Sequence, residues 1–175
     1  MSNTLVIYST VDGQTKAICE QVRKINQELG ATVTLASLDE AESLGLAQFD
    51  KILVAASIRY GKHRPELYQF INRHHAVLDA KKNAFFTVNV VARKPEKNTP
   101  ETNPYVKKFL ALSLWQPQQL AVFAGKIDYP KYRLFDKTMI RFIMWMTKGP
   151  TDTSGTFEFT DWNKVDEFAR AFAER

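Results

Sequence analysis

The sequence predicts a doubly wound α/β fold, in which helices cover both faces of a parallel sheet. Three observations point to it: short apolar segments recur along the chain, helical patterns lie between them, and a turn of small hydroxyl residues follows the first segment. Apolar runs without polar alternation are typical of parallel strands buried on both faces. The 175 residues, of which 45% are hydrophobic, suit a single domain spanning 1–175.

Each expected element rests on a local signal. The strands are predicted at 5–8, 32–35, 52–56, 84–91 and 120–123, where apolar and β-branched residues gather. Helices are predicted at 14–29, closed by Gly30, and at 65–78, opened by Pro65. Two more are predicted at 103–114, with Pro104 in the first turn, and at 162–173, after Asp161. The span 38–49 is ambiguous and fits a short helix.

The first apolar segment ends in a turn that suits phosphate binding. Ser9, Thr10 and Thr15 supply hydroxyl groups, and Gly13 allows a close backbone approach or a positive φ. Backbone N–H groups at a helix start lack partners within the helix and carry the positive end of its dipole. The turn lacks the glycine patterns of triphosphatases and dinucleotide sites, so a mononucleotide phosphate is the expected ligand. Ordinary helix capping is the alternative.

Two further loops are expected at the same edge, because ligands of doubly wound folds bind beyond the carboxyl ends of the strands. The loop at 57–62 combines an arginine, an aromatic residue and a glycine, which suits contact with a flat ring. The loop at 89–97 begins apolar and becomes strongly basic, as a solvated charge run or an anion site. The candidate ring-contacting residues are Ser57, Ile58, Arg59, Tyr60, Gly61, Val88, Asn89, Val90 and Val91.

Residues 126–153 make a segment that is too long for a structureless loop. Residues 126–148 hold six Lys/Arg against two Asp/Glu, within a chain of net charge +5. From 133 to 148 the helical period places cations in one sector and apolar residues opposite, which predicts a basic amphipathic helix. The expected membrane-contacting residues are Arg133, Phe135, Lys137, Met139, Arg141, Phe142, Trp145 and Met146; Ile143 shares the apolar side, and Tyr129 and Tyr132 also suit a lipid interface.

Three kinds of partner are conceivable for this helix. It is too short and too charged to span a bilayer, but it can lie in an anionic membrane surface. Packing on its own domain or on a second copy of the chain, as a homo-oligomer, is the alternative, and no nucleic-acid partner is expected. Because the chain starts without a basic leader followed by a long apolar segment, we expect it in the cytoplasm, peripherally bound to the inner membrane.

Metal and nucleophilic chemistry find little support. Cys19 falls within the first expected helix, where a buried, inert thiol is the favoured interpretation. His63, His74 and His75 lack the spacing of metal-binding helices, and no carboxylate cluster supplements them. No serine elbow is present either. We therefore expect neither a bound metal nor a catalytic triad.

With these loops in place, the chain resembles the flavodoxin-like family, whose members hold flavin mononucleotide (FMN) in the same three loops. Four segments narrow the resemblance to bacterial quinone-dependent protoporphyrinogen IX dehydrogenases: S-T-x-D-G-Q-T at 9–15, A-S-I-R-Y-G at 56–61, V-N-x-V-A-R-K-P-E-K at 88–97 and Y-P-x-Y-R at 129–133. The resemblance covers essentially the whole chain. It implies a three-layer sandwich whose five-stranded parallel sheet has the order 2-1-3-4-5, with a long insertion near the fifth strand.

One residue of the first loop departs from the flavodoxin pattern. Asp12 stands where flavodoxins usually carry threonine, and a carboxylate facing a phosphate would repel it. We therefore expect Asp12 to point away or to cap the helix. The residues expected to hold the phosphate are Thr10, Gly13, Gln14 and Thr15.

The resemblance also implies an activity. Such an enzyme of heme biosynthesis oxidises protoporphyrinogen IX to protoporphyrin IX and passes the electrons to a membrane quinone, menaquinone or ubiquinone. We expect the chemistry to be centred on the flavin, with no obligatory side-chain base. The two substrate propionates require cations beside an apolar shelf, for which the candidates are Arg59, Arg93, Lys94 and Lys97. The insertion helix would bring the flavin to the lipid surface.

Three rival functions fit the same fold. An NAD(P)H:quinone reductase would show nicotinamide-dependent flavin reduction. An electron-carrier flavodoxin would have no substrate of its own, but such carriers are typically acidic, whereas this chain has a pI of about 9.3. A phosphorylation receiver domain needs clustered carboxylates for a metal, and Asp12 has no acidic neighbour in the first loop.

Overall fold

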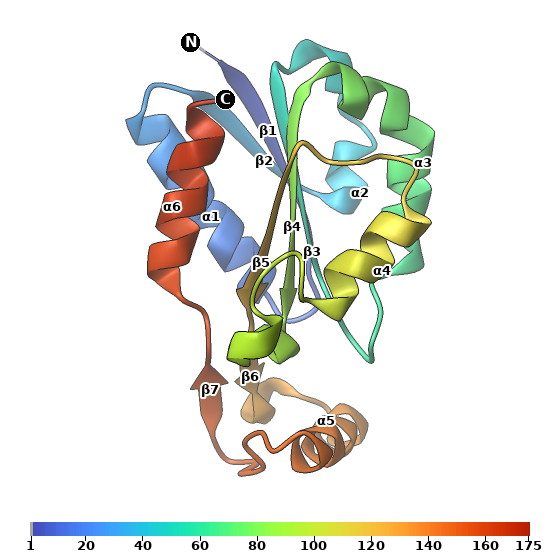
Figure 1. Ribbon diagram of the computed structural model, residues 1–175, viewed down its shortest axis with the longest axis vertical. Coiled ribbons are helices and arrows are strands. Elements are labelled where there is room, and N and C mark those ends of the chain that lie inside the picture. Colours follow the sequence, from blue (N-terminus) through green and yellow to red (C-terminus); the bar gives the residue numbers. More distant parts are fainter. Residues whose placement is uncertain (1) are drawn as a thin grey trace.

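The computed structural model describes residues 2–175, and it confirms the predicted fold class and strand order. Five parallel strands form one sheet in the order β2-β1-β3-β4-β5. The carboxyl ends of these strands all point toward the same end of the molecule (Figure 1). The strands are β1 (Asn3–Ser9), β2 (Thr32–Ser37), β3 (Lys51–Ser57), β4 (Lys82–Asn89) and β5 (Gln119–Ala124).

Helices cover both faces of this sheet. One face is covered by α1 (Gln14–Glu28) and α6 (Trp162–Ala173), and the other by α2 (Leu38–Ala41), α3 (Pro65–Ala80) and α4 (Pro104–Leu112) (Figure 1). The helix starts predicted from proline are confirmed, because Pro65 begins α3 and Pro104 begins α4. The ambiguous span resolves into α2, which opens with a Ser37–Glu40 capping box, and a 3₁₀ turn at Leu46–Gln48.

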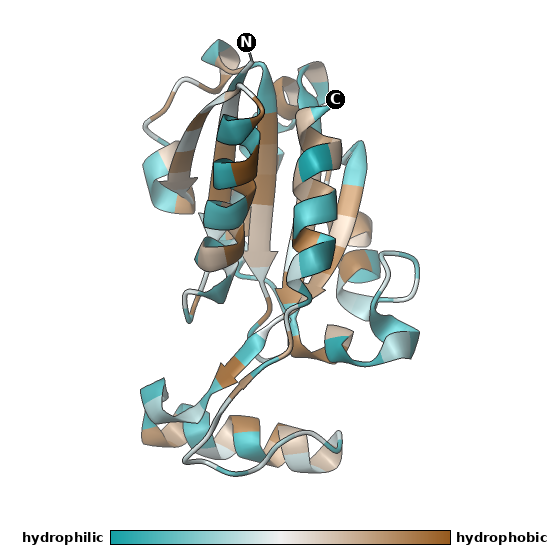
Figure 2. Ribbon diagram, turned by 90° about the vertical axis from the view of Figure 1, so that its left-hand side faces the viewer, coloured by the Kyte–Doolittle hydropathy of each residue, from teal (hydrophilic) through white to brown (hydrophobic). Residues whose placement is uncertain are grey.

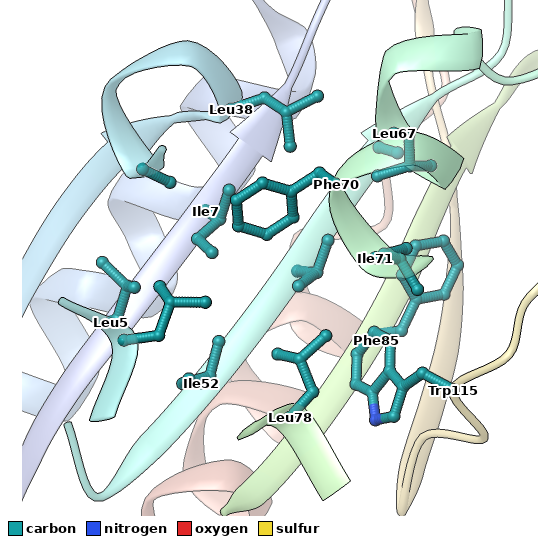
Figure 3. Packing of buried hydrophobic residues seen from close by; sticks show 14 of the residues in the cluster. Leu5, Ile7, Leu38, Ile52, Leu67, Phe70, Ile71, Leu78, Phe85 and Trp115 are labelled. Atoms are coloured by element: carbon teal, nitrogen blue, oxygen red, sulfur yellow. The ribbon is translucent and has the colours of Figure 1, made fainter. Parts of the chain in front are cut away.

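The alternation of side chains along each strand divides the core into two layers. Leu5 and Ile7 pack toward α2 and α3, whereas Val6 between them packs toward α1 and α6. In the first layer, Phe85 stacks on Phe109 with ring centroids 3.8 Å apart; Figure 3 shows Phe85 beside Trp115 and Ile71. Burial on both faces explains why the three central strands, β1, β3 and β4, appear as apolar runs in the sequence.

Most boundaries differ from the predicted ones by one or two residues, and two of these differences have a clear local cause. The fourth strand ends at Asn89 and not at Val91, because the Asn89 side chain accepts a hydrogen bond from the Ala92 N–H and starts a 3₁₀ turn, Val90–Arg93. The fourth helix begins one residue later than predicted because Asn103 caps it from outside. Cys19 is fully buried, as predicted, and burial raises the pKa of its thiol.

The segment after β5 extends beyond the carboxyl edge of the sheet (Figures 1 and 2). Two short antiparallel strands, β6 (Lys126–Asp128) and β7 (Thr156–Glu158), carry a 3₁₀ turn at Tyr129–Lys131 and the helix α5 (Leu134–Met146). The predicted helix in this segment is therefore confirmed, while β6 and β7 were not predicted. Within residues 2–175, no helix has both the length and the apolar character needed to cross a membrane.

His63 makes stability depend on pH. Its side chain is 3% exposed, and Nε2 lies 2.9 Å from the Thr87 hydroxyl. Burial, assisted by the positive charge of Lys108, lowers the pKa of His63 to about 4. In the unfolded chain a histidine takes up a proton near pH 6.5, so folding loses stability as the pH falls from about 6.5 toward 4.

We therefore expect the free energy of unfolding to be about 3 kcal/mol lower at pH 4 than at pH 7 through this group alone. Urea titrations between pH 4 and 7 measure it. His63→Gln should flatten this dependence by about the same amount. Parallel pH profiles for wild type and His63→Gln would show that His63 is not responsible.

Candidate functional site

A cavity with about 850 Å³ of empty space, partly open to solvent, lies at the carboxyl edge of the sheet. The loops after β1, β3 and β4 line it together, as the sequence predicted. Of the predicted cofactor-binding residues only two do not line it: Ser9 is buried beneath the loop, and Gly13 faces an adjacent hollow. The lining residues from the three loops are Thr10, Val11, Asp12, Gln14, Thr15, Ser57, Ile58, Arg59, Tyr60, Gly61, Val88, Asn89, Val90 and Val91.

The turn after β1 leaves hydrogen-bond donors free. Gly13 takes φ +91° at the N-cap of α1, and no side chain caps this helix. The Thr10 hydroxyl accepts the Gly13 N–H at 3.0 Å. The buried Thr15 hydroxyl lines the cavity, and none of residues 2–175 offers it a hydrogen-bond partner. A buried hydroxyl without a partner is costly, so this end of the cavity is built for a polar ligand.

Asp12 does not behave as predicted. It lines the cavity and forms an ion pair with Arg59, so it neither caps α1 nor points away. Burial lowers the pKa of Arg59, but the hydrogen bond and the charge of Asp12 together raise it by more. The net shift of the Arg59 pKa is therefore upward. The guanidinium thus offsets the negative charge that Asp12 brings to the phosphate turn, which explains how a carboxylate is tolerated there.

The ring-facing loop is a tight turn. Tyr60 and Gly61 have φ of +53° and +79°, and the Arg59 N–H donates to the Lys62 carbonyl at 3.1 Å. Two consecutive positive φ angles are the signature of a type I′ turn. Tyr60 is unusual in this conformation, and its ring lines the cavity while remaining 41% exposed. The turn therefore holds an aromatic face and a guanidinium together at the cavity wall.

A buried amide pair fixes the loop after β4. Asn89 donates to Asn103 at 3.2 Å, and Asn103 donates back at 3.1 Å. Asn103 also donates to the Lys97 carbonyl at 2.9 Å while its oxygen caps α4. This network sets the path of the loop that lines the cavity. Sequence reasoning could find only the helix start at Asn103, because its partner Asn89 lies fourteen residues away on another element.

The segment after β5 contributes a wall that the sequence did not predict. Ile143 was placed on the outward apolar side of the helix, but it faces the cavity with Ile140 and Met144. The spacing of these three residues, i, i+3 and i+4, is the signal that could have found the wall. Val11 of the first loop lines the cavity without having been predicted, and the lining residues from outside the three loops are Tyr105, Gly125, Lys126, Ile127, Tyr132, Ile140, Ile143 and Met144.

The outer side of α5 remains apolar and exposed. Phe135 is 71% exposed and Trp145 is 70% exposed. The other exposed large apolar residues of the helix are Leu134, Met139, Phe142 and Met146. The interfacial role expected for Tyr129 is wrong, because its ring is fully buried and its O–H donates to the Pro150 carbonyl at 2.6 Å. Tyr132 is also turned inward, to the cavity.

Only one of the four cations expected to bind propionates lines the cavity. That cation is Arg59. Arg93 instead donates to the carbonyls of Val90 and Thr147, each at 3.0 Å, and thereby ties the loop after β4 to the end of α5. Burial lowers the pKa of Arg93. Neither Lys94 nor Lys97 lines the cavity. Within residues 2–175, no group of three His, Cys, Asp or Glu residues could hold a metal ion.

A sheet of order β2-β1-β3-β4-β5, with a cavity beyond the strand ends and beside a glycine-bearing turn, is the arrangement of flavodoxin-like proteins. Residues 5–154 match the flavodoxin domain, and the chain belongs to this family. It is 42% identical over 170 residues to the protoporphyrinogen IX dehydrogenase [quinone] of Escherichia coli strain K12, covering 97% of this chain and 94% of that relative. Within the flavodoxin family it therefore belongs with the quinone-dependent protoporphyrinogen IX dehydrogenases.

Further comparisons agree. A protein of the same name from Leishmania major is also 42% identical, over 97% of this chain and 74% of the relative. Among solved structures, oxidised flavodoxin 1 of Bacillus cereus has a TM-score of 0.53 at 14% identity, covering 99% of each chain. A flavodoxin from Streptococcus pneumoniae TIGR4 has a TM-score of 0.55 at 11% identity, over 99% of this chain and 96% of the other. These structures support the fold.

Proposed function

We propose that this protein uses FMN to oxidise protoporphyrinogen IX to protoporphyrin IX and passes the electrons to a membrane quinone. One observation carries the proposal: three cofactor loops and the inner side of α5 line a single cavity. The loops supply a polar end and a ring-facing wall, and α5 supplies an apolar wall next to them. An electron carrier needs no such second wall, because it has no substrate of its own to enclose.

The residues present fit FMN. The free N–H groups at the start of α1 and the unpartnered Thr15 hydroxyl suit its phosphate. Tyr60 and Ile58 from one loop, and Val91 from the next, line the region that a flat ring would occupy. When bound, the isoalloxazine supplies hydride acceptance and onward electron transfer. The polypeptide contributes binding, orientation and the exclusion of water.

The remaining wall suits a large apolar macrocycle that carries carboxylates. Ile140, Ile143 and Met144 present apolar surface to the cavity and keep water from it. Two cations, Arg59 and Lys126, also line the cavity, and the guanidinium of Arg59 can bind a carboxylate through two parallel hydrogen bonds. The side chains thus position the substrate, while no histidine of residues 2–175 lines the cavity to serve as a base.

Reconstitution tests the proposal. Purified protein incubated with FMN and desalted should stay yellow, and the fluorescence of newly formed protoporphyrin should rise faster when menadione or a ubiquinone analogue is added. A preparation that retains no flavin would end the proposal. Flavin reduced by NADPH but not by protoporphyrinogen would instead identify an NAD(P)H:quinone reductase.

The same proposal includes a peripheral site at the cytoplasmic face of the inner membrane. The exposed apolar side of α5 is flanked by Arg133 and Arg141, which are also exposed. Apolar residues beside cations suit an anionic lipid surface, with the apolar side chains among the acyl chains and the cations near the headgroups. This arrangement supports delivery of electrons to a quinone dissolved in the bilayer.

Lys126 provides a test of phosphate recognition. It lines both the main cavity and the adjacent hollow at Gly13, and no ion-pair partner lies within 4.0 Å among residues 2–175. We expect Lys126→Gln to weaken FMN binding about fivefold to tenfold, because it removes one partly exposed cation, and to leave riboflavin binding unchanged. Quenching of flavin fluorescence measures both affinities.

Lys131→Gln is the matched control. Lys131 lines the same hollow but lies 3.6 Å from Asp128, which already neutralises it, so its loss should change FMN binding little. Equal losses for FMN and riboflavin in Lys126→Gln would mean that Lys126 supports the fold and not the phosphate.

A further inference from the structure

Arg59 is shared by two carboxylates from distant segments. Asp12, in the loop after β1, accepts a hydrogen bond from Nη2. Asp136, in the first turn of α5, has Oδ2 at 3.8 Å from Nη1. The Arg59 side chain is only 17% exposed, and its neighbour Tyr60 donates its O–H to Asp136. Asp136 thus connects the insertion helix to the turn that forms the ring-facing wall.

The two carboxylates hold Arg59 unequally. The separation of 3.8 Å from Asp136 exceeds hydrogen-bond distance, so this contact is only an ion pair. A guanidinium has five N–H donors. Asp12 accepts a hydrogen bond from Nη2, and the Tyr60 hydroxyl also interacts with the Arg59 side chain. Arg59 therefore retains donors, among them those of Nη1 on the side of Asp136, where a ligand carboxylate would take the place of Asp136.

The charge at this wall opposes such a ligand. One guanidinium faces two carboxylates, so the contact around Arg59 has a net negative charge, while the cation Lys126, without an ion-pair partner among residues 2–175, lines the cavity next to the Gly13 hollow. Besides Asp12, the ionisable side chains in contact with Asp136 or Arg59 from other segments are the Tyr60 hydroxyl, which donates to Asp136, and Tyr132, whose ring lies 5.3 Å from the Arg59 guanidinium carbon. Neither tyrosine adds positive charge. On α5 itself, Arg133 and Lys137 are near Asp136 in sequence, but among residues 2–175 neither lies within 4.0 Å of its carboxylate as an ion pair. An incoming carboxylate at Arg59 is therefore repelled by Asp136, the more weakly held partner.

We propose that Asp136 is a resident competitor at Arg59, which a carboxylate group of the ligand must displace, so that Asp136 sets how strongly carboxylate-bearing ligands are bound. The proposal rests on the proposed function, because the substrate propionates supply that carboxylate. Once displaced, Asp136 still accepts the hydrogen bond from Tyr60, so its own charge does not lose every partner. Asp136 acts here as a specificity-determining residue through Arg59.

Asp136→Asn separates charge from shape, because the amide keeps an acceptor for Tyr60. The FMN-loaded protein is titrated with protoporphyrin IX and with its dimethyl ester, and binding is followed by quenching of tryptophan fluorescence. We expect the variant to bind the diacid about fivefold to tenfold more tightly than wild type and the ester equally well. Unchanged or weaker diacid binding would overturn the proposal.

Two further variants sharpen this result. Asp136→Glu, which keeps the charge, should retain the wild-type preference between diacid and ester. Asp128→Asn removes a carboxylate of the same insertion that pairs with Lys131 and not with Arg59, and should change neither affinity. If wild type binds neither porphyrin, the proposed function fails, and this proposal with it. If wild type binds both and Asp136→Asn changes nothing, the role of Asp136 alone fails.

Discussion

The triple variant Arg133→Glu, Lys137→Glu, Arg141→Glu should bind anionic vesicles at least about a hundredfold more weakly than wild type. Each cation near an anionic surface contributes about 1 kcal/mol of attraction, and every 1.4 kcal/mol corresponds to a factor of ten. Replacement by glutamate adds repulsion to the lost attraction. Co-sedimentation with vesicles of mixed phosphatidylserine and phosphatidylcholine measures the change.

A matched variant separates the position of the charges from their number. Lys24→Glu, Lys107→Glu, Lys164→Glu makes the same change in net charge at exposed positions on α1, α4 and α6. This variant should keep most of the vesicle binding, because the three helices that it changes cover the sheet, away from α5 (Figure 2). Equal binding by wild type and the α5 variant would contradict the membrane role. A dimer in sedimentation velocity that α5 substitutions dissociate would assign this surface to a second copy.

The second large effect is expected at Asn103. Asn103→Ala removes the cap of α4 and leaves the buried Asn89 amide without its partner. A lost cap costs about 1 kcal/mol, and a buried polar group without a partner costs about 1–3 kcal/mol. We expect unfolding free energy to fall by about 3 kcal/mol. Denaturant titration of the FMN-free protein measures it without the contribution of the ligand.

Cofactor binding distinguishes this network from a simple cap. Because Asn103 fixes the loop that holds Val90 and Val91 at the cavity, Asn103→Ala should also weaken FMN binding by about tenfold or more. Ser37→Ala is the matched control, since Ser37 caps α2 through a 3.2 Å hydrogen bond from the Glu40 N–H and does not line the cavity. Unaltered FMN affinity in folded Asn103→Ala would show that the loop keeps its position without the amide pair.

The fold could be predicted from sequence because its signals are local. Strands buried on both faces appear as apolar runs, such as that of β3, whose first six residues are all buried. Prolines and glycines mark the helix ends. The strands β6 and β7 could not be found this way. Each has three residues, and they pair across more than twenty-five positions of sequence, so neither length nor pattern marks them.

The candidate site could be predicted in part for a topological reason. Because the carboxyl ends of parallel strands meet at one edge, three loops far apart in sequence had to converge there. The sequence does not show which side chains pair at that edge. The contact between Asp12 and Arg59 spans forty-seven positions, and neither residue carries a sign of its partner. Without that contact, Asp12 could only be expected to cap the helix or to point away, and Arg59 to contact the ring and bind a propionate.

For the helix α5, the sequence predicts where the helix forms but not which of its sides faces the protein. Its cations and aromatic residues gave a clear helical period, and the helix forms at Leu134–Met146. A single period cannot say which of two apolar stripes faces the protein. The stripe of Ile140 and Met144 lines the cavity, whereas that of Phe135 and Trp145 is exposed. This choice depends on the distance from α5 to the sheet, which the connection through β6 and β7 determines.

Anaerobic single-turnover mixing tests the central claim, that one cavity serves both FMN and the porphyrinogen. FMN-loaded protein is mixed with protoporphyrinogen IX in a stopped-flow spectrometer, and the visible absorbance of oxidised flavin is recorded before and after a quinone is added. The absorbance should fall as protoporphyrin fluorescence rises, and it should return when the quinone is added. Flavin that stays oxidised with excess protoporphyrinogen would contradict the claim.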